Sequence, residues 1–418
     1  MKVTFYLADH AGKVVDATNI EKGNPGIGGA QYCMLLLAHY LRLKGYEITI
    51  MAHRKYLLED GIEGIFDVER SRVVSEVQKK GTDILIVKNF IDKDLEKSIR
   101  KSKLKVVIWS HNFIYSDFAD FIKDTPQVIA NVFVGKQQYD NYIDDDVIKK
   151  SVTIFNMFPD SNVVPQKVER NKSVVFMGVI EPGKGFYEMA RMWQGIVSDV
   201  PEAQLYVLGN GCLYGEQQMG KLGIAEQHYE KKLEPLICDA QGEILKSIHF
   251  CGIVGGGKNA YFEKASVGVI NPSSSRETFG MGALEMASAK LPVATIGKTG
   301  YFDTIVNGET GILCKNISDL QKSIIEILKS NTETERLGNN AKVFLEKFSP
   351  QIIVDEWDCL LKSVYSDKFE AQYQSPSKPF TSQLKWLRVC NRFIRFSLRL
   401  KFVPSILRLE SFVRNVLR

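Results

Sequence analysis

The chain has 418 residues, of which 44% are hydrophobic and 25% charged, and its formal net charge is +5. This length exceeds one ordinary hydrophobic core and suffices for two domains, and the composition is typical of a soluble globular protein. The sequence has no apolar run near the roughly 20 residues that span a bilayer, and its opening, MKVTFYLADHAGK, reads as a strand instead of a signal peptide. We therefore expect the body of the protein in the cytoplasm.

Cysteine and histidine are spaced in a way that argues against metal and disulfide sites. The seven cysteines form no C-x-x-C pair, and the six histidines do not cluster at the spacing of metal ligands. The acidic run Asp144–Asp146 is interpreted as a solvated turn. We expect reduced thiols, no bound metal and no cofactor.

Short apolar runs alternate with amphipathic stretches along both halves of the chain, which is the pattern of parallel sheets covered by helices. In the first half the expected strands are Val3–Leu7, Ile48–Ala52, Ile84–Val87, Val106–Trp109 and Val132–Val134. In the second half they are Val174–Met177, Leu205–Leu208, Ile248–Cys251, Val267–Ile270 and Val293–Ile296. The fold class is therefore α/β, with two Rossmann-like, doubly wound domains.

A polar segment with two prolines, Asn156–Lys172, separates the halves and is the expected linker. It leaves a first domain over residues 1–158 and a second over residues 173–348. Ligands of doubly wound sheets bind beyond the carboxyl ends of the strands. We therefore expect the two domains to face a cleft that holds the functional site.

Two segments of the first domain are candidate parts of that site. Gly28 and Gly29 precede a helical pattern, so the backbone there can approach a phosphate or an acceptor hydroxyl closely; the alternative is a structural turn. His111 follows the strand Val106–Trp109 and is expected at the cleft edge, or else as a packed or capping residue.

The second domain offers two further segments. Lys184 lies in the loop FMGVIEPGKG, after a strand and before a helix, and it either reaches into the cleft or is a surface lysine. The stretch NPSSSRETFGMGALEMASAKLP, residues 271–292, reads as the end of a strand, a loop and a helix that starts near Gly280. Free N–H groups at such a helix start favour an anion, and Glu277 and Glu285 on either side can accept hydrogen bonds from diols. The alternative is that both glutamates are solvated surface residues without a function.

The stretch that contains Glu277 and Glu285 closely resembles the segment that marks retaining GT-B glycosyltransferases of family 4, the glycosyl transferases group 1. The resemblance covers roughly residues 1–365 and is strongest over 174–314. It implies that Glu277 contacts the donor sugar and Glu285 the ribose hydroxyls of a nucleotide sugar. By the same resemblance the other site residues are Gly28, Gly29, Gly178, Arg276, Thr278, Phe279 and Gly280 for the donor, Gln31 on the acceptor side, and Lys184 and His111 near the chemistry.

The chain also departs from the family pattern. Val179 stands where an arginine is usual, so one cation that neutralises the leaving diphosphate is missing, and Arg276 is a candidate to compensate for it. Asp303 replaces a more usual glutamate, and Lys290 a more usual glycine.

The resemblance implies transfer of a hexose-type unit from a nucleotide diphosphate sugar to a hydroxyl of a glycan or lipid-linked acceptor, with retention and without a metal. Surface polysaccharide or glycoconjugate synthesis is the expected context. Two alternatives stay open: a sugar-nucleotide epimerase or phosphorylase, and a catalytically silent subunit that binds a sugar nucleotide. Nucleic acid is not an expected partner, since the chain shows no binding motif.

The C-terminal part differs from the rest. Residues 349–366 resemble the closing helix of the family, and residues 367–418 form a basic tail, with ten Lys or Arg and one acidic residue after position 377. Arg388, Arg392, Arg395 and Arg399 recur at helical spacing. Pro404 interrupts this pattern. A basic amphipathic helix in the tail of residues 378–418 would bind an anionic membrane on its cytoplasmic face; the alternatives are a helix packed on the body and a contact with another subunit.

Overall fold

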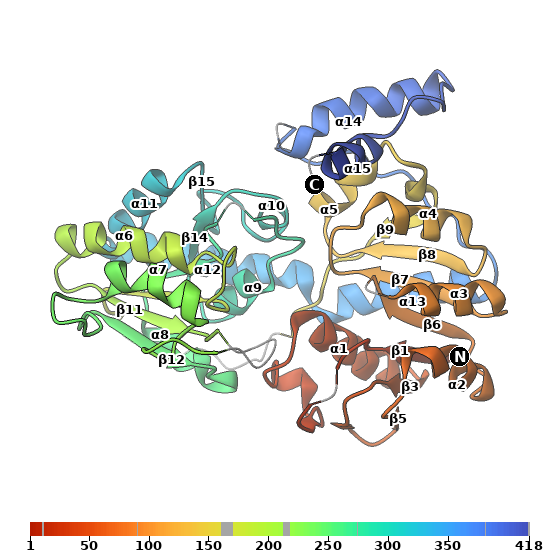
Figure 1. The fold of residues 1–418 in the computed structure, drawn as a ribbon, viewed down its shortest axis with the longest axis horizontal. Helices are drawn as coiled ribbons and strands as arrows, with labels where there is room; N and C mark the ends of the chain where they lie inside the picture. The colour runs from red at the N-terminus through yellow and green to blue at the C-terminus, as the bar shows by residue number, and fades with distance from the viewer. Residues whose placement is uncertain are drawn as a thin grey trace. The chain divides into compact units, whose positions relative to one another are not determined.

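The computed structural model describes residues 1–10, 12–89, 91–159, 170–211, 218–273, 275–380 and 382–416. The chain forms two compact units (Figure 1), one of Met1–Pro159 with Phe348–Arg418 and the other of Asp160–Lys347. Most of the expected linker, Asn156–Lys172, lies outside the described residues.

The first unit is built on a seven-stranded parallel sheet in the order β5-β3-β1-β6-β7-β8-β9. Its strands are β1 (Lys2–Tyr6), β3 (Glu47–Met51), β5 (Ile62–Ile65), β6 (Ile84–Lys88), β7 (Lys105–Ser110), β8 (Val128–Phe133) and β9 (Ser151–Thr153), with β2 (Val15–Asp16) and β4 (Tyr56–Leu57) paired separately. Its helices are α1 (Gly29–Leu43), α2 (Val73–Lys79), α3 (Lys93–Lys101), α4 (Ser116–Asp124), α5 (Lys136–Tyr139), α13 (Pro350–Tyr365), α14 (Lys385–Arg392) and α15 (Ile406–Val416).

The second unit has a six-stranded parallel sheet in the order β12-β11-β10-β13-β14-β15. Its strands are β10 (Ser173–Met177), β11 (Gln204–Leu208), β12 (Ile248–Gly252), β13 (Val267–Ile270), β14 (Val293–Ile296) and β15 (Gly311–Cys314). Its helices are α6 (Phe186–Asp199), α7 (Gln227–Ile237), α8 (Asn259–Lys264), α9 (Met281–Ser288), α10 (Tyr301–Thr304), α11 (Ile317–Lys329) and α12 (Asn331–Phe344).

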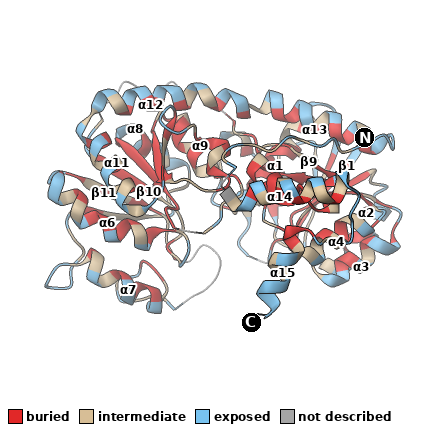
Figure 2. Cartoon of the chain, turned by 90° about the horizontal axis from the view of Figure 1, so that it is seen from above, coloured by how far each residue is buried: buried red, intermediate tan, exposed pale blue. Residues whose placement is uncertain are grey.

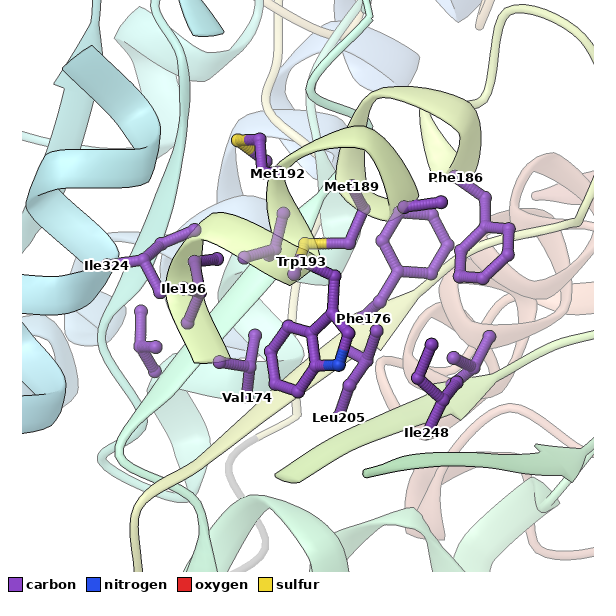
Figure 3. Close-up of a cluster of buried hydrophobic side chains, with 14 of the residues drawn as sticks. Val174, Phe176, Phe186, Met189, Met192, Trp193, Ile196, Leu205, Ile248 and Ile324 are labelled. Carbon is purple, nitrogen blue, oxygen red and sulfur yellow. The ribbon is translucent and has the colours of Figure 1, made fainter. Parts of the chain in front are cut away.

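Apolar side chains cover both faces of the second sheet, which is why its strands are continuous hydrophobic runs. Val174 and Phe176 of β10 pack on one face with α6, where Trp193 is fully buried (Figure 3). Trp193 donates its indole N–H to Ser247 Oγ at 3.0 Å. Val175, between them, packs on the opposite face with Met286 of α9. The alternation follows from the two-residue period of a strand.

Each strand predicted from the apolar runs is present, within one residue at most ends and four at the start of β8. The sequence reasoning missed β2, β4, β5, β9 and β15. β5 lies at the sheet edge, and none of its residues is fully buried, so it lacks a long hydrophobic run. β9 has three residues, too few for a periodic signal.

Helix α13 occupies the place of the expected closing helix and belongs to the first unit. Its fully buried Trp357 packs edge-on against Trp109 of β7, with ring centroids 4.6 Å apart. Lys105 extends to the end of the same helix and donates a hydrogen bond to the carbonyl of Tyr365 at 2.6 Å. A segment after position 347 therefore contributes to the core of the unit that begins at residue 1.

The solvated acidic turn predicted at Asp144–Asp146 is wrong. Asp144 and Asp145 are buried, because the C-terminal tail folds onto them. Asp144 Oδ2 accepts hydrogen bonds from the Ile406 N–H at 2.6 Å and from Asn391 Nδ2 at 2.8 Å. Burial raises the pKa of Asp144, and these hydrogen bonds partly offset that effect.

The basic tail at residues 378–418 is helical and breaks at Pro404 as predicted, but its cations are arranged differently. α14 continues through Phe393–Ser397, and a separate helix, α15, follows Pro404. Arg388 and Arg395 are buried instead of facing outward, and Arg392 stacks over the ring of Tyr373. The alternative of a tail packed on the body is therefore correct for these arginines.

Candidate functional site

The strand order of the second unit reverses between β10 and β13, which makes this the switch point of the sheet, where doubly wound folds bind ligands. The loop 178–185 follows β10, and the loop 271–280 follows β13. These loops contain Lys184 and Glu277, and α9 places Glu285 two turns further on. The structure thus brings the predicted donor-site residues of this unit to the carboxyl ends of the neighbouring strands β10 and β13.

Direct contacts hold the two loops together. Ser273 Oγ donates a hydrogen bond to the Gly183 carbonyl at 2.8 Å, and Ser275 Oγ donates to the same oxygen. Gly185 has a φ of +87°, and a Cβ atom there would lie 2.4 Å from Pro272 Cδ. Only glycine allows this approach without displacing one loop.

Glu277 is fixed by its own backbone. Its N–H donates to Thr299 Oγ1 at 2.9 Å, and its carbonyl accepts from the Gly300 N–H at 2.9 Å. The Thr278 N–H donates to the carboxylate of Glu277 at 3.1 Å. The loop between β14 and α10 therefore sets where this half-buried carboxylate stands, which the sequence motif alone does not reveal.

The loop enters α9 through Gly280, which has a φ of +86° and packs against the ring of Tyr301. Neither α9 nor α6, which follows Gly185, has a capping side chain at its N-terminus. Both helices start next to the joined loops, so uncapped N–H groups and two positive dipole ends are available to an anion there.

The remaining predicted residues of this segment differ in exposure. Arg276 is exposed, and Thr278 is half-buried. The ring of Phe279 is buried at 2% exposure, so this residue can offer a ligand only its backbone. Gly178 lies at the end of β10, where its N–H donates to the Leu208 carbonyl at 3.1 Å.

Glu285 forms an ion pair with Lys258, a residue that the sequence reasoning missed. The side chains of Glu285 and Lys258 are 15% and 21% exposed, so the pair is largely shielded from water. Lys258 ends the Gly255–Lys258 turn after β12. The sequence feature that could have indicated Lys258 is the run of three glycines and a lysine that follows an apolar strand.

Two lysines lie in or next to these loops. Lys184 is half-buried, and its ammonium group makes no hydrogen bond or ion pair with any described residue. Lys298, which the sequence reasoning also missed, donates to the carbonyl of Ser273 and lies 5.9 Å from the ring centroid of Tyr301. Burial lowers the pKa of Lys298 to about 8, and the nearby carboxylates of Glu277 and Glu188 partly offset this shift.

In the first unit, Gly28 caps the N-terminus of α1 and Gly29 begins it. Asn24 shapes the preceding loop, since its Oδ1 accepts the N–H groups of Gly26 and Ile27, both at 2.9 Å. The side-chain carbonyl of Gln31 folds back over Gly28, where a Cβ atom would lie 2.6 Å from Gln31 Oε1.

His111 follows β7 and packs against Trp109, with ring centroids 4.6 Å apart. Burial lowers the pKa of His111 to about 3, and the positive charge of Lys88 acts in the same direction. The imidazole is therefore neutral throughout the physiological pH range.

The described residues contain no group of three His, Cys, Asp or Glu residues that could hold a metal ion. They also contain no helix of the length and hydrophobicity needed to cross a bilayer.

Comparison with known proteins connects the second unit to a family. Residues 158–344 match the family model described as glycosyl transferases group 1. The chain is similar to the capsular polysaccharide biosynthesis glycosyltransferase CapM of Staphylococcus aureus, at 27% identity over 214 residues, or 50% of each chain. It is also similar to the trehalose synthase of Thermococcus litoralis, at 24% identity over 48% of this chain and 43% of the relative. The matched region thus spans about half the length of these relatives.

The whole architecture is shared with solved structures. Anabaena HepE, crystallised with UDP and glucose, superposes with a TM-score of 0.62 and 15% identity over 87% of this chain and 100% of HepE. At this identity the likeness concerns the fold. The chain has the GT-B fold, with two parallel-sheet α/β units and a helical C-terminal region.

Proposed function

We propose that this protein is a retaining glycosyltransferase of family 4 that moves a hexose-type sugar from a nucleotide diphosphate sugar to a hydroxyl of a glycan or lipid-linked acceptor. One observation carries the proposal: Glu277 precedes and Glu285 lies within α9, whose N-terminus, like that of α6, has no capping side chain and lies at the switch point of the region that matches the group 1 model. The name of CapM and the UDP bound to HepE support a sugar nucleotide as the donor and a polysaccharide as the product class.

The diphosphate of the donor occupies the helix starts of α6 and α9, because uncapped N–H groups there donate to anionic oxygens. Glu277 accepts hydrogen bonds from the sugar hydroxyls and orients the ring. Glu285 accepts the ribose hydroxyls, while its ion pair with Lys258 holds its carboxylate in place. This division of roles is the one that the resemblance to family 4 implies.

The departing diphosphate needs positive charge that a metal or an arginine would otherwise provide. Val179 provides none, and Arg276 is exposed. Lys298, between Ser273 and Tyr301 and near Glu277, is better placed to act beside Lys184. We therefore assign the compensating role to Lys298 instead of Arg276, and metal-independent transfer remains part of the proposal.

Retention is proposed through attack on the face from which the diphosphate leaves. The bond between the anomeric carbon and the phosphate oxygen breaks, and a bond from that carbon to the acceptor oxygen forms. The acceptor proton passes to the departing phosphate oxygen, so charge and atoms balance without a side-chain base. Glu277 orients the sugar and is not a nucleophile, and neutral His111 donates or accepts a hydrogen bond without carrying charge.

We assign Gly28, Gly29 and Gln31 to the acceptor hydroxyl and donor phosphate, on the grounds that α1 starts there with an uncapped N-terminus. The reaction is placed in the cytoplasm, at the inner membrane face where the acceptor is lipid-linked. A catalytically silent sugar-nucleotide-binding subunit is the second candidate, because Val179 removes a cation from the donor loop.

The test is a panel of nucleotide sugars, screened by thermal shift and followed by transfer from labelled donor to candidate glycan and lipid-linked acceptors. Glu277→Gln should retain nucleoside diphosphate binding and lose about 100-fold to 1000-fold in turnover. The matched control, Glu309→Gln, changes an exposed carboxylate of the same unit and should have no effect. Donor binding without transfer to any acceptor would favour the silent subunit, and release of epimer or sugar phosphate would identify an epimerase or phosphorylase.

A further inference from the structure

Helix α14 and its continuation through Ser397 place polar and apolar side chains opposite to the usual arrangement. Lys385, Arg388 and Arg395, three of its cations, are buried at 1–4% exposure. Trp386 and Phe393, seven residues apart on another face, are 55% and 58% exposed. A surface helix normally buries its apolar stripe. This one presents its apolar stripe to the surroundings.

Acidic partners explain why the cations point inward. Lys385 Nζ lies 2.9 Å from Asp140 Oδ2, and the guanidinium of Arg395 lies 2.8 Å from Asp146 Oδ2. Both aspartates belong to the segment that follows α5, so this segment of the first unit provides the acidic partners of the tail. Breaking such buried pairs is costly, and the pairs therefore fix which face of α14 points outward.

Helix α15 repeats the pattern. Leu409, Phe412, Val413 and Val416 recur at spacings of three and four residues and are 45–68% exposed. Figure 2 shows the last turns of α15 in the colour of exposed residues. In the connection before α15, Phe402 is 82% exposed, the largest value among the large hydrophobic residues that the structure describes.

The charge around these apolar residues has one sign. Between positions 378 and 416 the exposed charged residues among those that the structure describes are Lys378, Arg399, Lys401 and Arg414, all basic. The single acid of this range, Glu410, is half-buried and pairs with Arg388 at 2.6 Å. The exposed side chains of the tail therefore combine aromatic and aliphatic groups with a net positive charge.

We propose that this outer face of the tail lies on an anionic lipid bilayer, with its apolar side chains at the boundary between headgroups and acyl chains. The outer face comprises Trp386, Phe393, Phe402, Leu409, Phe412, Val413 and Val416 with the exposed cations Lys378, Arg399, Lys401 and Arg414. The cations lie at the level of the lipid phosphates.

Charge decides between a bilayer and a second copy of the chain. Two copies that met through this face would bring like charges together, and the tail offers no exposed acid to pair with them. An anionic lipid surface satisfies both the apolar groups and the cations. The proposal does not depend on the sugar donor, so it can fail while the proposed function stands.

The protein contains an intrinsic fluorescent probe of this face. It has four tryptophans, of which Trp109, Trp193 and Trp357 are less than 2% exposed, so Trp386 alone is exposed to the surroundings. Adding vesicles of phosphatidylglycerol and phosphatidylcholine should shift the tryptophan emission to the blue, and pure phosphatidylcholine should shift it much less. Emission that stays unchanged with both vesicles would overturn the proposal.

Flotation with the same anionic vesicles tests the residues. Phe393→Ser combined with Phe412→Ser should weaken binding at least about tenfold, because each removes exposed apolar area from the bilayer contact. Leu43→Ser combined with Val343→Ser, at residues 59% and 65% exposed elsewhere, is the matched control and should bind as the parent does. Equal loss in both double variants would contradict the assignment.

Reversing Arg399 and Lys401 to glutamate should weaken binding about fivefold for each charge and reduce its salt dependence. The remaining control is light scattering together with Trp386 emission, both measured without vesicles at increasing protein concentration. If the protein associates and the emission shifts with concentration alone, a second copy covers the face and the lipid proposal is wrong. Turnover on a soluble acceptor should be the same in all these variants.

Discussion

Lys298→Met should stabilise the protein near neutral pH while it weakens donor binding. Burial lowers the pKa of this lysine to about 8 from an ordinary value near 10.5. A shift of this size corresponds to a penalty of about 3 kcal/mol on the folded state at pH 7, and solvent access to the half-buried ammonium reduces it to about 1–2 kcal/mol. Methionine fills the same space without charge, so the penalty disappears.

The pH dependence identifies the cause. The folded protein releases the Lys298 proton near pH 8 and the unfolded chain near pH 10.5, so the unfolded chain binds more protons between these values. The stability of the parent should therefore rise relative to Lys298→Met as the pH increases from 8 to 10.5, and the difference should be largest below pH 8. Urea unfolding of both proteins at pH 7, 8.5 and 10 measures it. A constant difference, or a less stable variant at pH 7, would refute this reasoning.

The same variant links the lysine to the diphosphate. A cation that neutralises the leaving group supplies about 2–4 kcal/mol of transition-state stabilisation, so kcat/KM should fall about 30-fold to 1000-fold. In the parent, affinity for a nucleoside diphosphate should fall as the pH rises through about 8, because Lys298 loses its charge there. Calorimetry should show a flatter profile for Lys298→Met, and identical profiles would contradict the role of Lys298.

Three further substitutions test the surrounding geometry. Glu285→Gln should weaken nucleotide binding about tenfold to 100-fold in calorimetry, because ribose hydroxyls lose a charged acceptor and Lys258 loses its partner; unaltered affinity would remove Glu285 from the site. Gly185→Ala should lower both donor affinity and the free energy of unfolding, the latter by at least about 2 kcal/mol, since φ is +87° and Pro272 blocks the new methyl group; a stable variant with full affinity would contradict this. Arg388→Met should cost about 3–5 kcal/mol in denaturant unfolding, because Asp144 stays buried without its nearby cation; an equal effect of the exposed control Arg399→Met would refute the explanation.

The sequence predicted the architecture well because its signals were local. β10, β13 and β14 are short apolar runs with Gly or Pro nearby, and the period of α6 through Met189, Met192 and Trp193 is that of a helix buried on one face. The loop between β13 and α9 was also legible, since Gly280 marks the start of the helix. The roles expected for the site residues came from the resemblance to the family segment, because no local pattern indicates them.

What the sequence did not reveal depends on contacts between distant positions. Lys258 pairs with Glu285 across 27 residues, and Lys298 donates to Ser273 across 25, so neither lysine stands out in a local window. The acidic run at Asp144 was interpreted as solvated because the hydrogen-bond partners of Asp144 lie more than 240 residues further along the chain. For the same reason a tail that reads as a basic membrane helix folds with its arginines inward.

The most direct test of the central claim is isothermal titration calorimetry of the full-length protein with a panel of nucleotide diphosphate sugars. We predict that at least one binds with a stoichiometry of one, and that Lys184→Met and Glu285→Gln each weaken it at least about tenfold while Glu309→Gln does not. Absence of binding by every sugar nucleotide, or binding that neither Lys184→Met nor Glu285→Gln alters, would contradict the assignment of this loop pair as the donor site.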